Sequence, residues 1–312
     1  MKKWISIVLF LLLFFSIDVF AERQILIDFN NLQNTELDIV KLAGPNALTV
    51  ADADKDKLLI SLDPNNWEVQ LSPSARTIEN IVNSITKAVV PGSGEYKGQT
   101  VLGARIHFPT GKYAAWAKIM PPYEIPSYEA ADANDKIGNK YVNKGVLRNV
   151  GPIKTVMITV KGRNFPHSLT IRLKNQNDEY IDIFVGYLDF NGWRTFRIDN
   201  PNYIADVRKR NLKKFPLYPQ EEPYVKLDSF IVYKYSDGPG GDFIIYIKSV
   251  EMIYDLAVLT AEEDINDELV WGILAARREA KKRAEAARVG IIQLLRFEEK
   301  KKMATESAEE KK

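Results

Sequence analysis

Residues 154–198 read KTVMITVKGRNFPHSLTIRLKNQNDEYIDIFVGYLDFNGWRTFRI. They divide into four short segments rich in β-branched and aromatic residues, separated by residues that favour turns. In the first segment Val156, Ile158 and Val160 partly alternate with polar residues, as expected of a strand with one buried face. The Asn-Gly step at 191–192 is typical of a tight hairpin turn. The stretch therefore predicts consecutive antiparallel strands.

The same pattern extends over most of the chain. Further strands are expected at Gln24–Phe29, Lys57–Leu62, Trp67–Leu71, Thr100–Phe108, Tyr113–Met120, Lys226–Tyr235 and Phe243–Tyr254. Short strands joined by turns with Pro and Gly, and without alternation between strands and helices, favour two packed sheets. We therefore expect a mainly β protein in which residues 22–258 form an antiparallel β-sandwich.

Two stretches between the strands have the composition of connections. Tyr123–Leu147 contains few β-branched residues and many small and polar ones, so it is expected to be a long surface loop that crosses between the sheets. Phe215–Pro223 contains three prolines and is expected to be a stiff connector.

Two other segments show helical spacing. Arg76–Val90 carries β-branched apolar residues at helical intervals and is expected to form a helix. The segment from about Ala261 to Met303 contains no Pro and predicts a long helix with one narrow apolar stripe. The stripe consists of Leu269, Ile273, Ala276, Ala280, Ala284, Ala287, Ile291 and Leu294. We expect a helical extension over residues 259–303 and a disordered tail over residues 304–312.

The first 21 residues have the three-part layout of a secretory signal. Two Lys residues give a positive start, an apolar run follows, and Val19 and Ala21 supply small side chains before a cleavage point. The apolar run is too short to span a bilayer comfortably, and a retained N-terminal anchor is the alternative. We expect residues 1–21 to be a signal peptide and the mature chain to have no stable membrane insertion.

Composition limits the chemistry that the chain can perform. The formal net charge is +2, which gives no general reason to expect nucleic-acid binding. The chain has no Cys, which excludes disulfides, thiol nucleophiles and Cys-ligated metals, and its only histidines are His107 and His167. Asp52, Asp54 and Asp56 alternate as calcium ligands do, but the closing Gly and Glu of the helix–loop–helix site are missing. We expect no catalytic, cofactor-binding or metal-binding residues.

The aromatic residues are open to two interpretations. Tryptophans lie on predicted strands and tyrosines lie nearby in the sequence: Trp67, Trp116, Trp193, Tyr123, Tyr128 and Tyr203. Large aromatic side chains can fill a sandwich core, or they can form a flat platform on which sugars stack. The second interpretation makes a periplasmic carbohydrate-binding module the alternative function. An exported hydrolase with an unrecognised site is a third hypothesis.

Several segments resemble one known family. They are Asn65–Arg76, Thr100–Pro109, Ile119–Pro126 and the pair Gly192-Trp193 followed by Asn200–Ile204. In this order they are similar to the spirochaetal flagellar filament outer layer (sheath) proteins of the FlaA family. The similarity extends from near the start of the mature chain to about Asp255.

The resemblance implies a structural protein and not an enzyme. It implies a jelly-roll-like β-sandwich that is exported to the periplasm and coats the flagellin core of the periplasmic flagellum. The partners implied are the flagellin core and other sheath subunits, whether copies of this chain or paralogues. Such a coat would contribute to the stiffness and shape of the filament and to motility.

Loops and the C-terminal helix are the candidate contact surfaces. The residues proposed for assembly contacts are Met120, Pro121, Pro122, Tyr123, Tyr128, Asn200, Pro201, Tyr203, Arg277, Arg278, Lys281 and Lys282. Prolines fix the backbone in advance, so docking costs less entropy. Internal packing at the corners of the sheets is the alternative for the loops. The helix either bridges to a neighbouring sheath subunit or an acidic flagellin surface, or lies solvated on its own domain.

Overall fold

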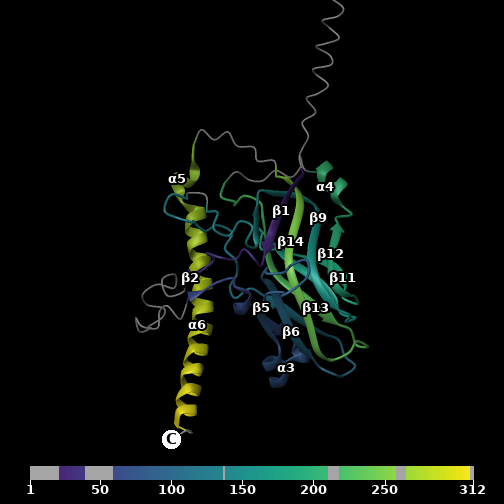
Figure 1. Ribbon diagram of the computed structural model, residues 1–312. Coiled ribbons are helices and arrows are strands. Elements are labelled where there is room, and N and C mark those ends of the chain that lie inside the picture. The colour runs from purple at the N-terminus through teal and green to yellow at the C-terminus, as the bar shows by residue number, and fades with distance from the viewer. Residues whose placement is uncertain (1–20, 39–58, 136–137, 210–217, 258–264, 310–312) are drawn as a thin grey trace, which may run out of the picture.

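The computed structural model describes residues 21–38, 59–135, 138–209, 218–257 and 265–309. Within them the chain forms two large antiparallel sheets and a long helix at the C-terminal end (Figure 1). The expected signal peptide, apart from Ala21, the aspartates at 52, 54 and 56, and the first part of the expected Phe215–Pro223 connector lie outside the described residues. No helix among the described residues is long and apolar enough to cross a membrane.

Each of the two sheets has six strands. The first contains β12 (Asn191–Asp199), β9 (Val150–Arg163), β14 (Gly241–Leu256), β6 (Val101–Phe108) and β5 (Ile85–Val89) in that order, and β1 (Ala21–Asp28) pairs with β14. The second contains β11 (Tyr180–Tyr187), β10 (Ser168–Asn175), β13 (Tyr224–Lys234), β7 (Ala115–Met120) and β4 (Glu68–Leu71), and β8 (Val146–Arg148) pairs with β13. A separate hairpin joins β2 (Leu37–Asp38) to β3 (Leu59–Ile60). The sequence prediction of an antiparallel β-sandwich is confirmed.

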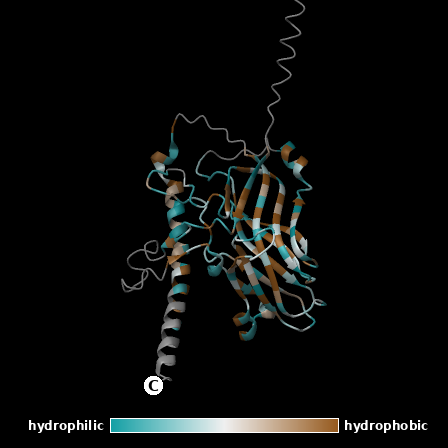
Figure 2. Cartoon of the chain, in the orientation of Figure 1, coloured by the Kyte–Doolittle hydropathy of each residue, from teal (hydrophilic) through white to brown (hydrophobic). Residues whose placement is uncertain are grey.

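The core lies between the two sheets. Alternating residues of the strands point inward, as in β7, where Ala115, Ala117 and Ile119 are buried. Near one end of the core, the ring of Phe29, just after β1, packs at 5.1 Å from that of Trp67, which stacks on Phe230 of β13 at 6.1 Å. Figure 2 shows the resulting alternation of apolar and polar residues along the strands.

Within the described residues the helices are short except for the last one. They are the 3-10 turns η2 (Pro64–Asn66) and η3 (Pro73–Ala75), and the α-helices α3 (Ile78–Asn83), α4 (Tyr203–Lys209), α5 (Asp267–Trp271) and α6 (Ile273–Glu309). At 1.5 Å per residue α6 is about 55 Å long. It runs alongside the sandwich, with loops between them (Figure 1).

The helix predicted over Arg76–Val90 is only partly present. It forms over Ile78–Asn83, and Ile85–Val89 is instead strand β5, which pairs with Val101–Arg105 of β6. The reason is that β-branched residues are stiff and pack well on a pleated sheet, so pairing with β6 overrides the local helical spacing.

Tyr123–Leu147 is not a simple surface loop. Tyr123, Ile125 and Tyr141 are almost completely buried, and the segment ends in β8. Burial of these rings and aliphatic groups stabilises the segment by more than burial of its neighbouring polar groups costs. The segment fills the space between the sandwich and α6.

The C-terminal helix differs from the prediction in three ways. Gly272, with φ at +60°, ends α5 in the left-handed conformation that caps helices, so α5 and α6 are separate. The helix α6 then passes through Gly290 and continues to Glu309, which covers most of the tail that was expected to be disordered. The predicted apolar stripe is also largely exposed, since Ala276, Ala280 and Ala284 face solvent. Among the side chains of α6 whose burial is described, Ala286 and Val289 are buried.

Candidate functional site

The side of α6 that faces the sandwich is held by charged residues. Four cations that the sequence put forward as contacts to other subunits bind partners within the same chain. Arg277 donates to the carbonyl oxygen of Pro219 (3.0 Å), Arg278 to Glu221 (3.1 Å), Lys281 to Asp178 (3.2 Å) and Lys282 to Glu129 (3.0 Å). They therefore fix α6 on its own sandwich.

Tyr128 lies at the centre of this seam. Its ring is sandwiched between two guanidinium groups, that of Arg148 at 4.3 Å and that of Arg278 at 4.0 Å. Each guanidinium is also held by a carboxylate, Glu222 for Arg148 (2.8 Å) and Glu221 for Arg278 (3.1 Å). Cation–π contacts of this kind are stronger where water is excluded, and burial raises the pKa of the Tyr128 hydroxyl above its usual value. The structure thus brings together Tyr128 and Arg278, which the sequence proposed separately.

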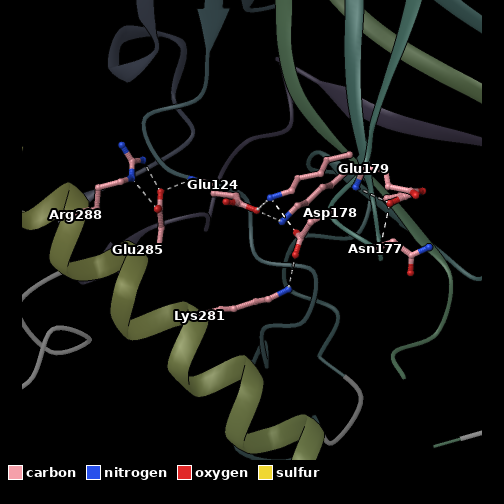
Figure 3. Close-up of polar contacts among 10 residues, drawn as sticks. Glu124, Asn177, Asp178, Glu179, Lys281, Glu285 and Arg288 are labelled. Carbon is pink, nitrogen blue, oxygen red and sulfur yellow. Dashed lines mark hydrogen bonds and ion pairs between the residues drawn. The ribbon is translucent and has the colours of Figure 1, made fainter. Parts of the chain in front are cut away.

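Glu124 connects α6 to the second sheet. Its Oε1 accepts hydrogen bonds from Nζ of Lys226 (2.6 Å) and Nζ of Lys174 (2.8 Å) (Figure 3). Its backbone N–H donates to Oε1 of Glu285 on α6 at 2.7 Å, and Glu285 is paired with Arg288. One residue of a loop therefore contacts two strands and the helix.

A second bridge runs through Asp178. This carboxylate accepts from Lys174 at 3.0 Å and from Lys281 of α6 at 3.2 Å (Figure 3).

Burial alone would raise the pKa of Glu124, but Lys226 and Lys174 outweigh it and lower that pKa. Burial likewise lowers the pKa of Lys226, so its positive charge depends on an ionised Glu124 beside it.

A cavity of about 640 Å³ lies along this seam between α6 and the sandwich. Acidic and basic side chains alternate on its wall, among them Glu124, Lys226 and Arg278. Most of these opposite charges are paired with one another as described above, although Oε2 of Glu129 is buried with no hydrogen-bond partner among the described residues. This arrangement clamps the helix and offers no excess of one charge to a ligand.

The first predicted contact loop is mostly internal. Pro121 and Pro122 are buried, Met120 is half-buried, and Tyr123 is 1% exposed. The Tyr123 hydroxyl donates to the carbonyl oxygen of Thr35 at 2.6 Å. This loop therefore packs at the corner of the sheet and positions the neighbouring Glu124.

The second predicted contact loop is a capped turn at the start of α4. The amide of Asn200 donates to the carbonyl oxygen of Ile153 at 2.8 Å, and the hydroxyl of Tyr203 donates to Asp255 at 3.0 Å. Both partners lie on strands of the first sheet, so the turn is rigidly attached. Pro201 remains exposed at its tip.

The aromatic residues divide between the core and the surface. Trp67 is buried and donates from Nε1 to the carbonyl oxygen of Leu62, whereas Trp116 and Trp193 are half-buried. Exposed rings gather instead on β11 and beside it, at Phe184, Tyr187 and Tyr235. Neighbouring rings of this group are inclined at 75° and 41°, so they do not make the flat platform that sugar stacking requires.

The two histidines lie in unrelated environments. His107 is 2.8 Å from Asp242 near the surface, and His167 is buried against the rings of Phe108 and Phe165. Burial, with a smaller effect of Lys234, lowers the pKa of His167 to about 4. In the described part of the chain, no three His, Asp or Glu residues are grouped as metal ligands are.

Comparison with known proteins identifies the family. The family model for the flagellar filament outer layer protein FlaA matches residues 29–263. The chain belongs to this family. A flagellar filament outer layer protein of Spirochaeta aurantia is 38% identical over 322 residues, which cover 98% of this chain and 95% of that one. A protein of the same description from Treponema pallidum is 37% identical, over 92% of this chain and 90% of that one.

A third relative, from Borreliella burgdorferi, is 31% identical over 70% of this chain and 63% of its own length. Among solved structures, a carbohydrate-binding module in complex with β-1,4-galactotriose has a TM-score of 0.30 and 9% identity, over 61% of this chain and 88% of that one. A family 11 carbohydrate-binding module has a TM-score of 0.28 and 12% identity, over 64% of this chain and 91% of that one. The likeness is confined to the arrangement of strands.

Sequence reasoning missed the residues on the sandwich side of the seam. Glu124, Asp178 and Lys226 were not singled out, although Asp178 binds Lys281 of α6 and Glu124 binds Lys226. One signal was present, because Lys226 lies in a strand that is otherwise mostly buried. A lysine in such a position is almost never fully buried unless it is paired.

Proposed function

We propose that this chain is a structural subunit of the outer layer of the spirochaete periplasmic flagellar filament, where it coats the flagellin core. Membership of the family carries this proposal, because the family match covers most of the sandwich. The alignment with the relative from Spirochaeta aurantia, over 98% of this chain, also takes in the C-terminal helix. In this role the subunit contributes to the stiffness and shape of the filament and so to motility.

The proposed location is the periplasm. Residues 1–21 act as a signal peptide, in keeping with their positive start, apolar run and small residues before a cleavage point. A filament that rotates between two membranes requires coat subunits that are exported and then assemble without a membrane anchor.

The fold suits a rigid building block. Two packed sheets resist bending, and α6 is clamped to them by ion pairs along the seam. A coat is held by many neighbours at once, so each contact can be modest. We also propose that the exposed Pro201 turn and the outer side of α6 contact the flagellin core or neighbouring subunits.

Labelling of purified periplasmic flagella with gold-conjugated antibody against this chain tests the location. Label along the filament is expected, and label dispersed evenly through the cells would contradict the proposal. Co-sedimentation of the mature chain, residues 22–312, with filaments stripped of their outer layer tests the binding. A chain that stays in the supernatant at all concentrations would contradict a coating role.

A further inference from the structure

An apolar patch is exposed on α3 and at the start of β5. Ile78 is 84% exposed and Val82 is 69% exposed, and Ile81 and Ile85 are exposed beside them. These residues are spaced as on one face of a helix, and the structure exposes them to solvent. Four β-branched aliphatic side chains within eight residues make a surface that water wets poorly. We call these four residues the α3 patch.

A second apolar patch lies on α5. Leu269 is 85% exposed and Trp271 is 68% exposed, with Val270 between them and Ile265 before the helix. We call these four residues the α5 patch. The short helix that carries them is not frayed, because both of its ends are capped.

The caps of α5 involve side chains on both sides of the patch. The Asn266 side chain accepts from the N–H of Leu269 at 3.1 Å, and Glu268 accepts from the backbone N–H groups of Leu274 and Ala275 at 3.0 and 2.8 Å. The hydroxyl of Tyr218 accepts from the N–H of Ile273 at 3.0 Å. The α5 patch is therefore presented to solvent by a fixed piece of backbone.

The two patches lie at opposite ends of the molecule, with α5 at the top of Figure 1 and α3 at the bottom. Both short helices carry brown segments in Figure 2, which marks apolar residues, beside teal ones. They cannot cover one another within one chain. A contact between the α5 patch of one copy and the α3 patch of the next is heterologous, and such contacts repeat as an open row instead of closing a dimer.

Charges beside the patches are complementary. Arg76 precedes the α3 patch, Lys87 follows it and Glu79 lies within it; all three are exposed, so two cations outnumber one acid there. Asp267 lies next to the α5 patch. None of Arg76, Lys87 and Asp267 has an ion-pair partner among the residues that the structure describes.

We propose that the α5 patch of one subunit docks on the α3 patch of a second copy of this chain, with Asp267 facing Arg76 and Lys87, so that subunits join head to tail in rows. This inference rests on the proposed function, for which it supplies the contact between neighbouring subunits. Burial of one large apolar side chain at a contact strengthens the association constant by about 10- to 100-fold.

Self-association of the mature chain, measured by sedimentation velocity over a range of concentrations, tests the proposal with paired variants. Val82→Asp removes the α3 patch, and Trp271→Ser removes the α5 patch. Each variant alone is expected to associate at least about 10-fold more weakly than wild type. An equimolar mixture is expected to form a dimer that does not extend, because each partner keeps one intact patch.

Tyr180→Ser is the matched control, since it removes an exposed apolar ring from β11 and lies in neither patch. It is expected to associate like wild type. Unchanged melting temperatures are expected for all three variants, because the substituted side chains are exposed. A Trp271→Ser variant that still dimerises alone through α3 would overturn the head-to-tail geometry, as would wild-type chain that stays monomeric at all concentrations.

Co-sedimentation with stripped filaments separates this inference from the proposed function. Wild type is expected to bind steeply with concentration, and Val82→Asp is expected to bind with a shallower curve, because neighbours no longer support one another. Absence of binding by wild type would count against the coating role itself. Equally steep binding by wild type and Val82→Asp would leave the coating role standing and overturn the row contact.

Discussion

Replacement of Glu124 by Gln tests whether the seam is an electrostatic clamp. The substitution keeps the size of the side chain and removes its charge. Two ammonium groups then lose their carboxylate, that of Lys226 at 2.6 Å and that of Lys174 at 2.8 Å. Lys174 retains Asp178, whereas the side chain of Lys226 is only 7% exposed and bonds to Glu124 alone among the contacts described.

The expected loss of stability follows from this difference in burial. A fully buried ion pair that loses one partner costs about 3–5 kcal/mol. The Glu124 side chain is 45% exposed, so water screens part of the interaction and we expect a loss of about 2 kcal/mol. For a domain of this size each kcal/mol lowers the melting temperature by about 2–4 °C, so a decrease of about 4–8 °C is expected.

Thermal and urea unfolding of the mature chain measure this loss. Glu279→Gln is the matched control, because Glu279 lines the same cavity but is 51% exposed and pairs with Arg283 of its own helix instead of a residue of the sandwich, so its loss is expected to cost at most about 0.5 kcal/mol. Adding Lys226→Met to Glu124→Gln removes the unpaired charge and is expected to restore part of the stability. Equal effects of Glu124→Gln and Glu279→Gln, or strict additivity in the double variant, would refute the clamp.

The lowered pKa of Glu124 gives a dependence on pH with a definite sign. A carboxylate whose pKa is lower in the folded state contributes its full stability above the unfolded value, and that contribution is lost as the pH falls through the folded value. The difference in stability between wild type and Glu124→Gln is therefore expected to be largest near neutral pH and to shrink in acid.

Three further predictions concern the core, a histidine and the helix. Trp67→Ala is expected to lower the free energy of urea unfolding by about 3–5 kcal/mol, because Trp67 is buried between Phe29 and Phe230. Replacing the half-buried Trp193 with Ala is expected to lower it far less. The pKa of His167 falls from 6.5 to about 4 on folding, so the unfolded chain binds more protons between these values. Stability is then lost as the pH decreases from 6.5 to 4, by about 3 kcal/mol more than in His167→Phe, and parallel pH profiles would contradict a buried neutral ring. Deletion of residues 262–312 is expected to weaken binding to filaments while the sandwich still melts in one cooperative transition, and loss of that transition in calorimetry would show that the helix is needed for folding.

Much of the architecture could be predicted because strand formation leaves a local record. Alternation of apolar residues, β-branched composition and turn residues between them located the strands from Gln24 to Tyr254, and they pair as an antiparallel sandwich. Helical spacing failed at Ile85–Val89, where a neighbouring strand decided the conformation. The prediction from composition failed within Tyr123–Leu147, where buried tyrosines hold a segment whose composition is mostly small and polar.

The sequence by itself determined the sandwich class, the long C-terminal helix and the resemblance to the family, since each depends on patterns within short stretches of chain. Only the tertiary structure decided which side of α6 meets the sandwich. The sequence showed an apolar stripe without deciding what it contacts, whereas the residues that hold the seam are far apart in the chain: Glu124 and Lys226 by 102 positions, and Asp178 and Lys281 by 103. Paired opposite charges inside the seam contribute more to the position of α6 than a few alanine side chains that stay exposed. Because the partners are so far apart in sequence, no local pattern predicts that they meet.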